Sequence, residues 1–239
     1  MPDHRSSPAA GVRARARAEL TAQIKDVARA HLAEHGAAAL SLRAVAREIG
    51  MVSSAIYRYF PSRDDLLTAL IVDAYDALGE RAEASEAATA GQGTDARWAA
   101  LAAAVRGWAR DRPHEYALVF GSPVPGYAAP SDTVDPAARA PLVLLRLLAD
   151  GVASGEVVAS DDRIETTRAL RQDLARLRSL APGVPDPVLV RGLYVWTQLF
   201  GLVSFELFGH LHGVIDDHDA HFALQVRRAG TLLRTGRLT

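Results

Sequence analysis

The chain has 239 residues, of which 49% are hydrophobic and 23% charged, a composition typical of an ordinary soluble globular protein. Its length suits one large domain or two small ones. The lack of cysteine excludes disulfides, thiolate metal sites and cysteine nucleophiles, and it fits a reducing compartment. No apolar signal segment is apparent at the N-terminus, so we expect a cytoplasmic protein.

The formal net charge of −1 does not point to a nucleic-acid partner, but the charges are unevenly distributed. Residues 1–60 carry nine lysines and arginines against five aspartates and glutamates, a balance of +4. The rest of the chain therefore carries about −5, so the cations are concentrated toward the N-terminus.

The first 15 residues are expected to form a flexible basic arm. Arginines alternate at its end, which leaves two roles open: a solvated terminus, or an arm that follows DNA phosphates or a minor groove. From Ala16 to His35 apolar residues recur with a period of 3.6, which predicts a helix, and Gly36 is expected to end it.

The stretch Ser41–Phe60 has the pattern of two short helices joined by a tight turn. Ser41 can cap the first helix, whose apolar face is formed by Leu42, Val45, Ala46 and Ile49. Gly50 breaks the pattern, and Ser53 or Ser54 can cap a second helix that runs to Phe60. This arrangement predicts a helix-turn-helix, whose second helix enters the DNA major groove.

At 100° per residue, the second helix directs Val52, Ile56 and Phe60 toward the core. Its outward arc carries small, hydroxyl-bearing and cationic side chains: Ser54, Ala55, Tyr57, Arg58 and Tyr59. Small residues permit close approach, hydroxyls can bind phosphates, and arginine can contact guanine in a bidentate manner. An ordinary surface helix with two incidental tyrosines is the alternative.

The next helix begins after Pro61, where Ser62 and Asp65 have the spacing of a capping box. Arg63 lies in its first turn, where a cation is unfavourable beside the positive end of the helix dipole. A nearby phosphate would offset this, so Arg63 is a candidate DNA-backbone contact, with a solvated arginine as the alternative.

The run from Leu20 to Leu78 resembles the TetR (AcrR) family of bacterial transcriptional regulators. The closest resemblance lies in SLRAVAREIGMVSSAIYRYFPSRDDLLTALI, which joins a Tyr-x-Tyr/His-Phe recognition-helix end to a Pro/Lys-Ser-Lys/Arg-x-x-Leu helix start. The resemblance implies an all-α homodimer whose three-helix heads bind double-stranded DNA at an inverted repeat. It implies DNA contacts by Ser41, Arg43, Ser53, Ser54, Ala55, Tyr57, Arg58, Tyr59 and Arg63. Lys or Pro and Gly often stand at the positions of Ser53 and Ser54, so the operator sequence does not transfer.

The resemblance also implies a larger C-terminal helical domain that binds a small-molecule inducer. We expect a helix-turn-helix domain over residues 16–62, a connecting helix over 63–88 and a ligand-binding and dimerisation domain over 89–239. Helices are predicted in the last domain at 95–112, 114–120, 136–154, 161–180, 186–211 and 217–235.

The helix predicted over 186–211 is apolar nearly all round, so it must be covered on more than one side. A partner subunit could supply the second cover, and two antiparallel helix pairs would form a four-helix bundle across a dimer axis. Gln198 and Glu206 interrupt this stretch, so no membrane partner is expected. VWTQLFGLVSFELFG also resembles a TetR subgroup named for a Trp and a His-Gly, although Phe200 replaces the usual His before Gly201.

Large side chains are expected near any cavity for a mostly apolar inducer. The candidates are Trp108, Tyr116, Phe120, Tyr127, Trp196 and Phe200. Plain core packing is the alternative for each of them. Glu206 could contact the inducer or pair with another residue at the dimer interface.

A polar cluster near the C-terminus has metal-ligand residue types: His210, His212, Asp216, Asp217, His218, Asp219 and His221. Its spacing matches no known site, so we predict no metal, and a solvated loop is the favoured interpretation. No nucleophile elbow, P-loop or dinucleotide fingerprint is present, so neither an enzyme nor a cofactor is expected. The sequence predicts a ligand-responsive repressor; a helical scaffold or a small-molecule-binding protein without operator control is the alternative.

Overall fold

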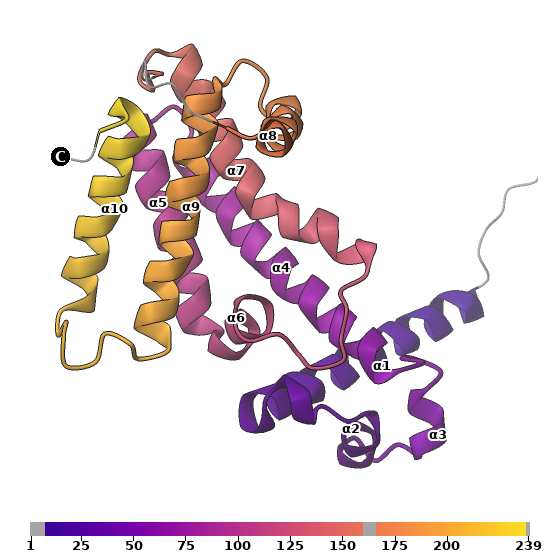
Figure 1. Ribbon diagram of the computed structural model, residues 1–239. Helices are drawn as coiled ribbons and strands as arrows, with labels where there is room; N and C mark the ends of the chain where they lie inside the picture. The colour runs from indigo at the N-terminus through magenta and orange to yellow at the C-terminus, as the bar shows by residue number, and fades with distance from the viewer. Residues whose placement is uncertain (1–7, 160–165, 238–239) are drawn as a thin grey trace, which may run out of the picture. The chain divides into compact units, whose positions relative to one another are not determined.

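The computed structural model describes residues 8–159 and 166–237, and in these ranges the chain is all-helical, with no strand (Figure 1). The α-helices are α1 (Pro8–His35), α2 (Leu42–Glu48), α3 (Ser53–Ile56), α4 (Arg63–Ala88), α5 (Thr94–Asp111), α6 (Pro113–Phe120), α7 (Val134–Ala153), α8 (Arg168–Leu180), α9 (Asp186–Leu207) and α10 (His218–Thr235). Two short 3₁₀ helices, η1 (Ala37–Ala39) and η2 (Ser131–Thr133), complete the set. The predicted all-α class is confirmed.

The chain divides into two compact units. Unit 1 comprises Met1–Ala74 and His114–Thr133, and unit 2 comprises Tyr75–Pro113 and Val134–Thr239. The segment 114–133 therefore groups with the helix-turn-helix, whereas the sequence placed it in the C-terminal domain. Side-chain contacts account for this grouping: the Tyr127 hydroxyl lies 2.9 Å from Thr68 Oγ1, and Arg29 Nε lies 3.4 Å from a Glu115 carboxylate oxygen.

Unit 1 has a core of aliphatic side chains from its helices. Ile24, Ala28, Val45, Ile56, Leu66, Leu67 and Leu70 are all essentially inaccessible to solvent. Helix α1 begins at Pro8, several residues before the expected start at Ala16, because the alanines and arginines of this stretch are strong helix formers. Residues 1–7 of the expected basic arm lie outside the described ranges.

Unit 2 is a bundle in which α5 contacts α7, α9 and α10, and α9 also contacts α7, α8 and α10. Trp98 is buried in its core and donates a hydrogen bond from Nε1 to the Val226 carbonyl at 2.9 Å. Glu156 accepts a hydrogen bond from the Thr94 amide at 2.7 Å, which satisfies a free donor at the start of α5. Helix α8 buries only Leu174, consistent with the peripheral position expected for it.

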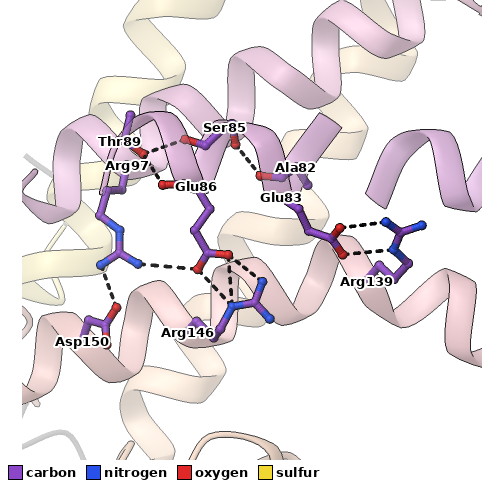
Figure 2. Close-up of polar contacts among 9 residues, drawn as sticks. All are labelled: Ala82, Glu83, Ser85, Glu86, Thr89, Arg97, Arg139, Arg146 and Asp150. Carbon is purple, nitrogen blue, oxygen red and sulfur yellow. Dashed lines mark hydrogen bonds and ion pairs between the residues drawn. The ribbon is translucent and has the colours of Figure 1, made fainter. Parts of the chain in front are cut away.

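A ladder of ion pairs joins the C-terminal half of α4 to α5 and α7 within unit 2 (Figure 2). The Arg139 guanidinium of α7 binds both carboxylate oxygens of Glu83 at 2.7 and 3.0 Å and reaches Asp76 at 2.7 Å. About two turns after Arg139 on α7, Arg146 binds Glu86 at 2.6 Å. Arg97 of α5 lies 3.8 Å from the same carboxylate. The hydrogen bond from Arg139 lowers the pKa of Glu83.

Helix α9 ends at Leu207, four residues earlier than predicted, and Gly209 follows with a φ of 77°. In the sequence Trp196, Phe200, Val203 and Leu207 share one apolar face of this helix, but of these four only Val203 is buried. The core face is formed by Val188, Leu189, Val195, Leu199 and Val203, and Trp196 and Phe200 are half-buried. A helix that is apolar nearly all round has no clear boundary between an apolar and a polar face, so periodicity alone does not identify which face is buried.

By length and composition, α9 is also the one helix of the described ranges that could cross a membrane. A core helix of a soluble protein passes the same test, and α9 packs against four neighbours in unit 2. Its apolar character is therefore accounted for in part by the bundle.

Candidate nucleic-acid interface

The turn between α2 and α3 is held by backbone hydrogen bonds that close the end of α2. The Met51 amide donates to the Ala46 carbonyl at 2.8 Å, and the Gly50 amide donates to Arg47 at 3.2 Å. With Gly50 at a φ of 70°, this is a Schellman motif, which satisfies carbonyls that a helix end otherwise leaves unpaired. At the other end, Ser41 caps α2 by accepting from the Ala44 amide, as predicted.

The predicted recognition helix is shorter than the sequence suggested. Helix α3 covers only Ser53–Ile56, and turns continue the chain to Phe60, whose amide donates to the Ile56 carbonyl at 3.0 Å. The predicted serine cap is wrong, because Val52 occupies the cap position and no side chain caps the helix.

The core face of this element was predicted correctly at two of three positions. Ile56 and Phe60 are buried, as expected. Val52 is 70% exposed, since it precedes the helix in extended conformation and the helical angle does not apply to it.

The outward positions predicted for DNA contact are largely accessible. Ser53, Ser54, Tyr57 and Arg58 are exposed, as is Arg43 on α2, whereas Ser41, Ala55, Tyr59 and Arg63 are half-buried. The element thus offers hydroxyls and a guanidinium on a short stretch of chain, the groups that bind phosphates and base edges.

Not every cation of unit 1 is available for a polyanion. Lys25 and Arg29 form ion pairs with Asp73 and are each less than one-third exposed. Arg43, Arg47 and Arg58 are exposed to solvent on α2 and on the turn after α3. The exposed positive charge of unit 1 therefore lies on the helix-turn-helix and on the exposed arginines near the start of α1.

Arg63 has a structural role that the sequence did not reveal. Its guanidinium donates to the backbone carbonyls of Leu40 at 3.1 Å, Ala37 at 2.9 Å and Ala38 at 3.2 Å. These carbonyls belong to η1 and to the residue before the α2 cap, so Arg63 holds the entry to the helix-turn-helix. Beside it, the Ser62 hydroxyl accepts from the Asp65 amide at 3.1 Å, as one half of the predicted capping box requires, and donates to the Asp65 carboxylate at 2.7 Å.

Arg17, one of the arginines that alternate at the end of the expected basic arm, contacts the recognition element. It lies on α1 and donates to the Arg58 carbonyl at 2.8 Å, with its guanidinium 5.0 Å from the centroid of the Tyr59 ring. No local sequence pattern indicates a contact across 41 residues.

The six aromatic residues proposed for ligand contact do not form one group. Tyr116, Phe120 and Tyr127 belong to unit 1, whereas Trp108, Trp196 and Phe200 belong to unit 2. None of the six lines the apolar groove between α9 and α10, which has a volume of about 630 Å³. Trp196 and Phe200 contact each other with ring centroids 4.9 Å apart.

Glu206 is paired within its own subunit. Arg106 of α5 binds both of its carboxylate oxygens at 2.8 Å and also lies 2.7 Å from Asp219 at the start of α10. Burial acts to lower the pKa of Arg106, but the hydrogen bonds to Glu206 and Asp219 outweigh it and raise that pKa. Among the described residues, no group of three or more histidines and carboxylates is arranged to hold a metal ion.

Comparison with known proteins identifies both parts of the chain. Residues 24–70 match the family model described as bacterial regulatory proteins, tetR family, and residues 98–229 match a tetracyclin repressor-like C-terminal domain. The second match alone covers more than half of the 239 residues.

Individual relatives agree with the family models. The chain is 41% identical over 202 residues to the HTH-type transcriptional regulator Rv1816 of Mycobacterium tuberculosis, covering 83% of this chain and 85% of that protein. The crystal structure of SCO4313, whose regulatory role is itself only proposed, is 37% identical and has a TM-score of 0.74, over 90% of this chain and 97% of that one. A Rhodococcus sp. RHA1 protein of unknown function, 22% identical, shares the fold with a TM-score of 0.66 over the full length of both chains.

The short α3 with its exposed hydroxyls, the exposed guanidinium just after it, the closed turn before it and the matches over both parts of the chain agree with one another. Proteins of this class act by binding DNA and are not enzymes. The chain belongs to the TetR family of bacterial transcriptional regulators.

Proposed function

We propose that this regulator is a cytoplasmic homodimeric repressor that a small, mostly apolar molecule releases from an inverted-repeat operator. The observation that supports operator reading is the exposure of Ser53, Ser54, Tyr57 and Arg58 on and just after a short helix that follows a closed turn. Ser41, Arg43, Ala55, Tyr59 and Arg63 complete the proposed contact set. No cofactor, metal or membrane takes part in this proposal.

Operator reading is tested with double-stranded oligonucleotides enriched from a random pool by the purified protein, alongside a duplex of scrambled sequence. We expect a specific affinity at least about 10³-fold above the scrambled duplex at physiological salt. Arg58→Ala should lower this affinity ratio by relaxing the sequence preference at the one base position that Arg58 contacts. Arg171→Ala, on the exposed surface of α8, should leave the ratio unchanged. No enrichment of any sequence would refute the repressor proposal.

The homodimer is supported by the apolar side chains that α9 and α10 leave exposed in the single chain. Phe205 is 54% exposed and Tyr194 46%, and Phe208, Leu193 and Leu224 are each more than 40% exposed. The groove between the two helices continues this surface and contains Gly201, whose Cα has open space beside it. A second copy that packs the same two helices across a two-fold axis would bury this surface in a four-helix bundle.

Sedimentation equilibrium tests the dimer with a matched pair of variants. Leu193 on α9 and Leu170 on α8 are both 41% exposed. Leu193→Glu should shift the protein toward monomer, because a carboxylate would be desolvated in the interface, while Leu170→Glu should remain dimeric. A wild-type protein that is monomeric at micromolar concentration would contradict the proposal.

The ligand proposal is supported by aromatic side chains of unit 2: the buried Trp108 on α5 and the half-buried Trp196–Phe200 pair on α9 belong to helices that contact each other. Apolar ring surface suits an apolar inducer. Tyr116, Phe120 and Tyr127 of unit 1 remain the other candidate contacts. A screen of small apolar compounds by tryptophan fluorescence, followed by release of the enriched duplex, tests this; compounds that bind without releasing DNA would argue against induction.

A further inference from the structure

Helix α3 is too short to be stable without contacts to the rest of the chain. With four residues it forms little more than one turn, far short of the roughly 12–15 residues that an isolated helix needs in water, and Ile56 is its one buried residue. Three residues that we expect to contact DNA, Tyr57, Arg58 and Tyr59, lie beyond its last helical residue. Their geometry must therefore come from contacts outside the helix.

Arg17 provides such a contact at the end of this element. Its guanidinium donates a 2.8 Å hydrogen bond to the Arg58 carbonyl, in the turn two residues beyond the end of α3. The same guanidinium lies 5.0 Å from the centre of the Tyr59 ring, within cation–π distance.

Helix α1 gives Arg17 a rigid base. The residue lies inside a 28-residue helix, and one turn later the Thr21 hydroxyl donates to the Arg17 carbonyl at 2.8 Å. Further along, Ile24 and Ala28 anchor α1 in the core of unit 1. A side chain fixed at one end to this helix can hold the exposed chain after α3 in a defined position.

We infer that Arg17 is a positioning residue for operator reading: it clamps the chain at Arg58–Tyr59 so that α3 and the turn after it present their side chains in one orientation. This inference rests on the proposed DNA contact by Tyr57, Arg58 and Tyr59. It assigns to an exposed cation of α1 a role in sequence discrimination, which differs from a phosphate contact because the guanidinium binds protein and not DNA.

The free protein provides the first test, by amide hydrogen exchange followed with NMR. The Tyr59 and Phe60 amides donate to the Ile56 carbonyl at 2.9 and 3.0 Å, so their exchange reports opening of this element. Arg17→Ala should speed their exchange about tenfold, the loss expected for a charged hydrogen bond and a cation–π contact at an exposed site. Arg15→Ala, which removes an exposed arginine of the same helix, should leave their exchange unchanged. The thermal midpoint should be unchanged in both variants.

The second test is binding to the enriched duplex and to the scrambled duplex across a salt series. A clamp predicts that Arg17→Ala lowers the ratio of specific to non-specific affinity about tenfold and leaves the salt slope unchanged. Equal weakening on both duplexes with a salt slope reduced by about one would identify a phosphate contact and overturn the inference. Unchanged exchange in the free protein would overturn it as well.

Failure of the clamp and failure of operator reading are separable. If the wild-type protein enriches no sequence, the proposed function fails, whatever the exchange rates show. If it enriches a sequence but Arg17→Ala changes neither exchange nor the affinity ratio, only the clamp fails.

Discussion

Arg63 is expected to contribute more to the stability of the DNA-binding head than to DNA affinity. Its guanidinium donates to three backbone carbonyls at 2.9–3.2 Å, and its side chain is only 30% exposed. A net hydrogen bond from a charged donor is worth about 1.5–3 kcal/mol, and solvent at a partly exposed site reduces this. Because the three bonds share one side chain, we expect Arg63→Ala to destabilise unit 1 by about 2 kcal/mol in total.

Amide exchange of α2 in the free protein measures this loss, because α2 follows directly from the carbonyls that Arg63 holds. A loss of about 2 kcal/mol corresponds to exchange about 30-fold faster where opening is limited to unit 1. Arg43→Ala, an exposed arginine of α2, is the control and should leave exchange unchanged while lowering DNA affinity. Unchanged exchange in Arg63→Ala, with only a smaller salt slope, would show that the phosphate contact alone is correct.

Three further predictions concern unit 2. Arg106→Met should destabilise unit 2 by about 3–5 kcal/mol in urea titrations, because Glu206 would be left buried without its partner. The double variant Arg106→Met with Glu206→Leu should recover most of this stability, and a double variant as unstable as the single one would contradict the reasoning. Hydrogen bonds from Arg139 and from Thr94 lower the pKa values of Glu83 and Glu156, respectively. The stability that these carboxylates contribute above pH about 4.5 should therefore fall as the pH drops through their lowered pKa values. Glu156→Gln should flatten this pH dependence, and an unchanged pH profile would argue against it. Gly79→Ala should lower the thermal midpoint, since its Cβ would lie 2.7 Å from Arg139 Cβ, whereas Gly107→Ala, with no neighbour closer than 3.5 Å, should raise it slightly; a raised midpoint for both would show that Arg139 moves freely.

The sequence determined the local features of the head well because they depend on residues close in the chain. Ser41 caps α2, Gly50 adopts a positive φ, and Ser62 accepts from the Asp65 amide at the start of α4. Each of these follows from residue type and short spacing. The burial of Ile56 and Phe60 follows equally from helical periodicity over one turn.

Contacts between distant segments could not be predicted in the same way. Arg63 looked like a residue free to meet phosphate, and only the fold brings the Ala37–Leu40 carbonyls to it. The cation–π contact of Arg17 with Tyr59 joins a residue of α1 to one in the turn after α3. Glu206 could face a ligand or a partner as far as the sequence showed, and its pairing with Arg106 depends on the packing of α5 against α9.

The brevity of α3 has a consequence for how such a regulator can diversify. Because Ile56 is its only buried residue, substitutions at Ser53 and Ser54 alter exposed positions and should cost at most about 0.5 kcal/mol of stability. The contacts that orient Ser53 and Ser54 are made by other residues: the Schellman turn at Gly50, and the arginines Arg17 and Arg63. A gene duplicate could therefore acquire a new DNA-sequence preference by changing a few codons in α3, with its fold left intact.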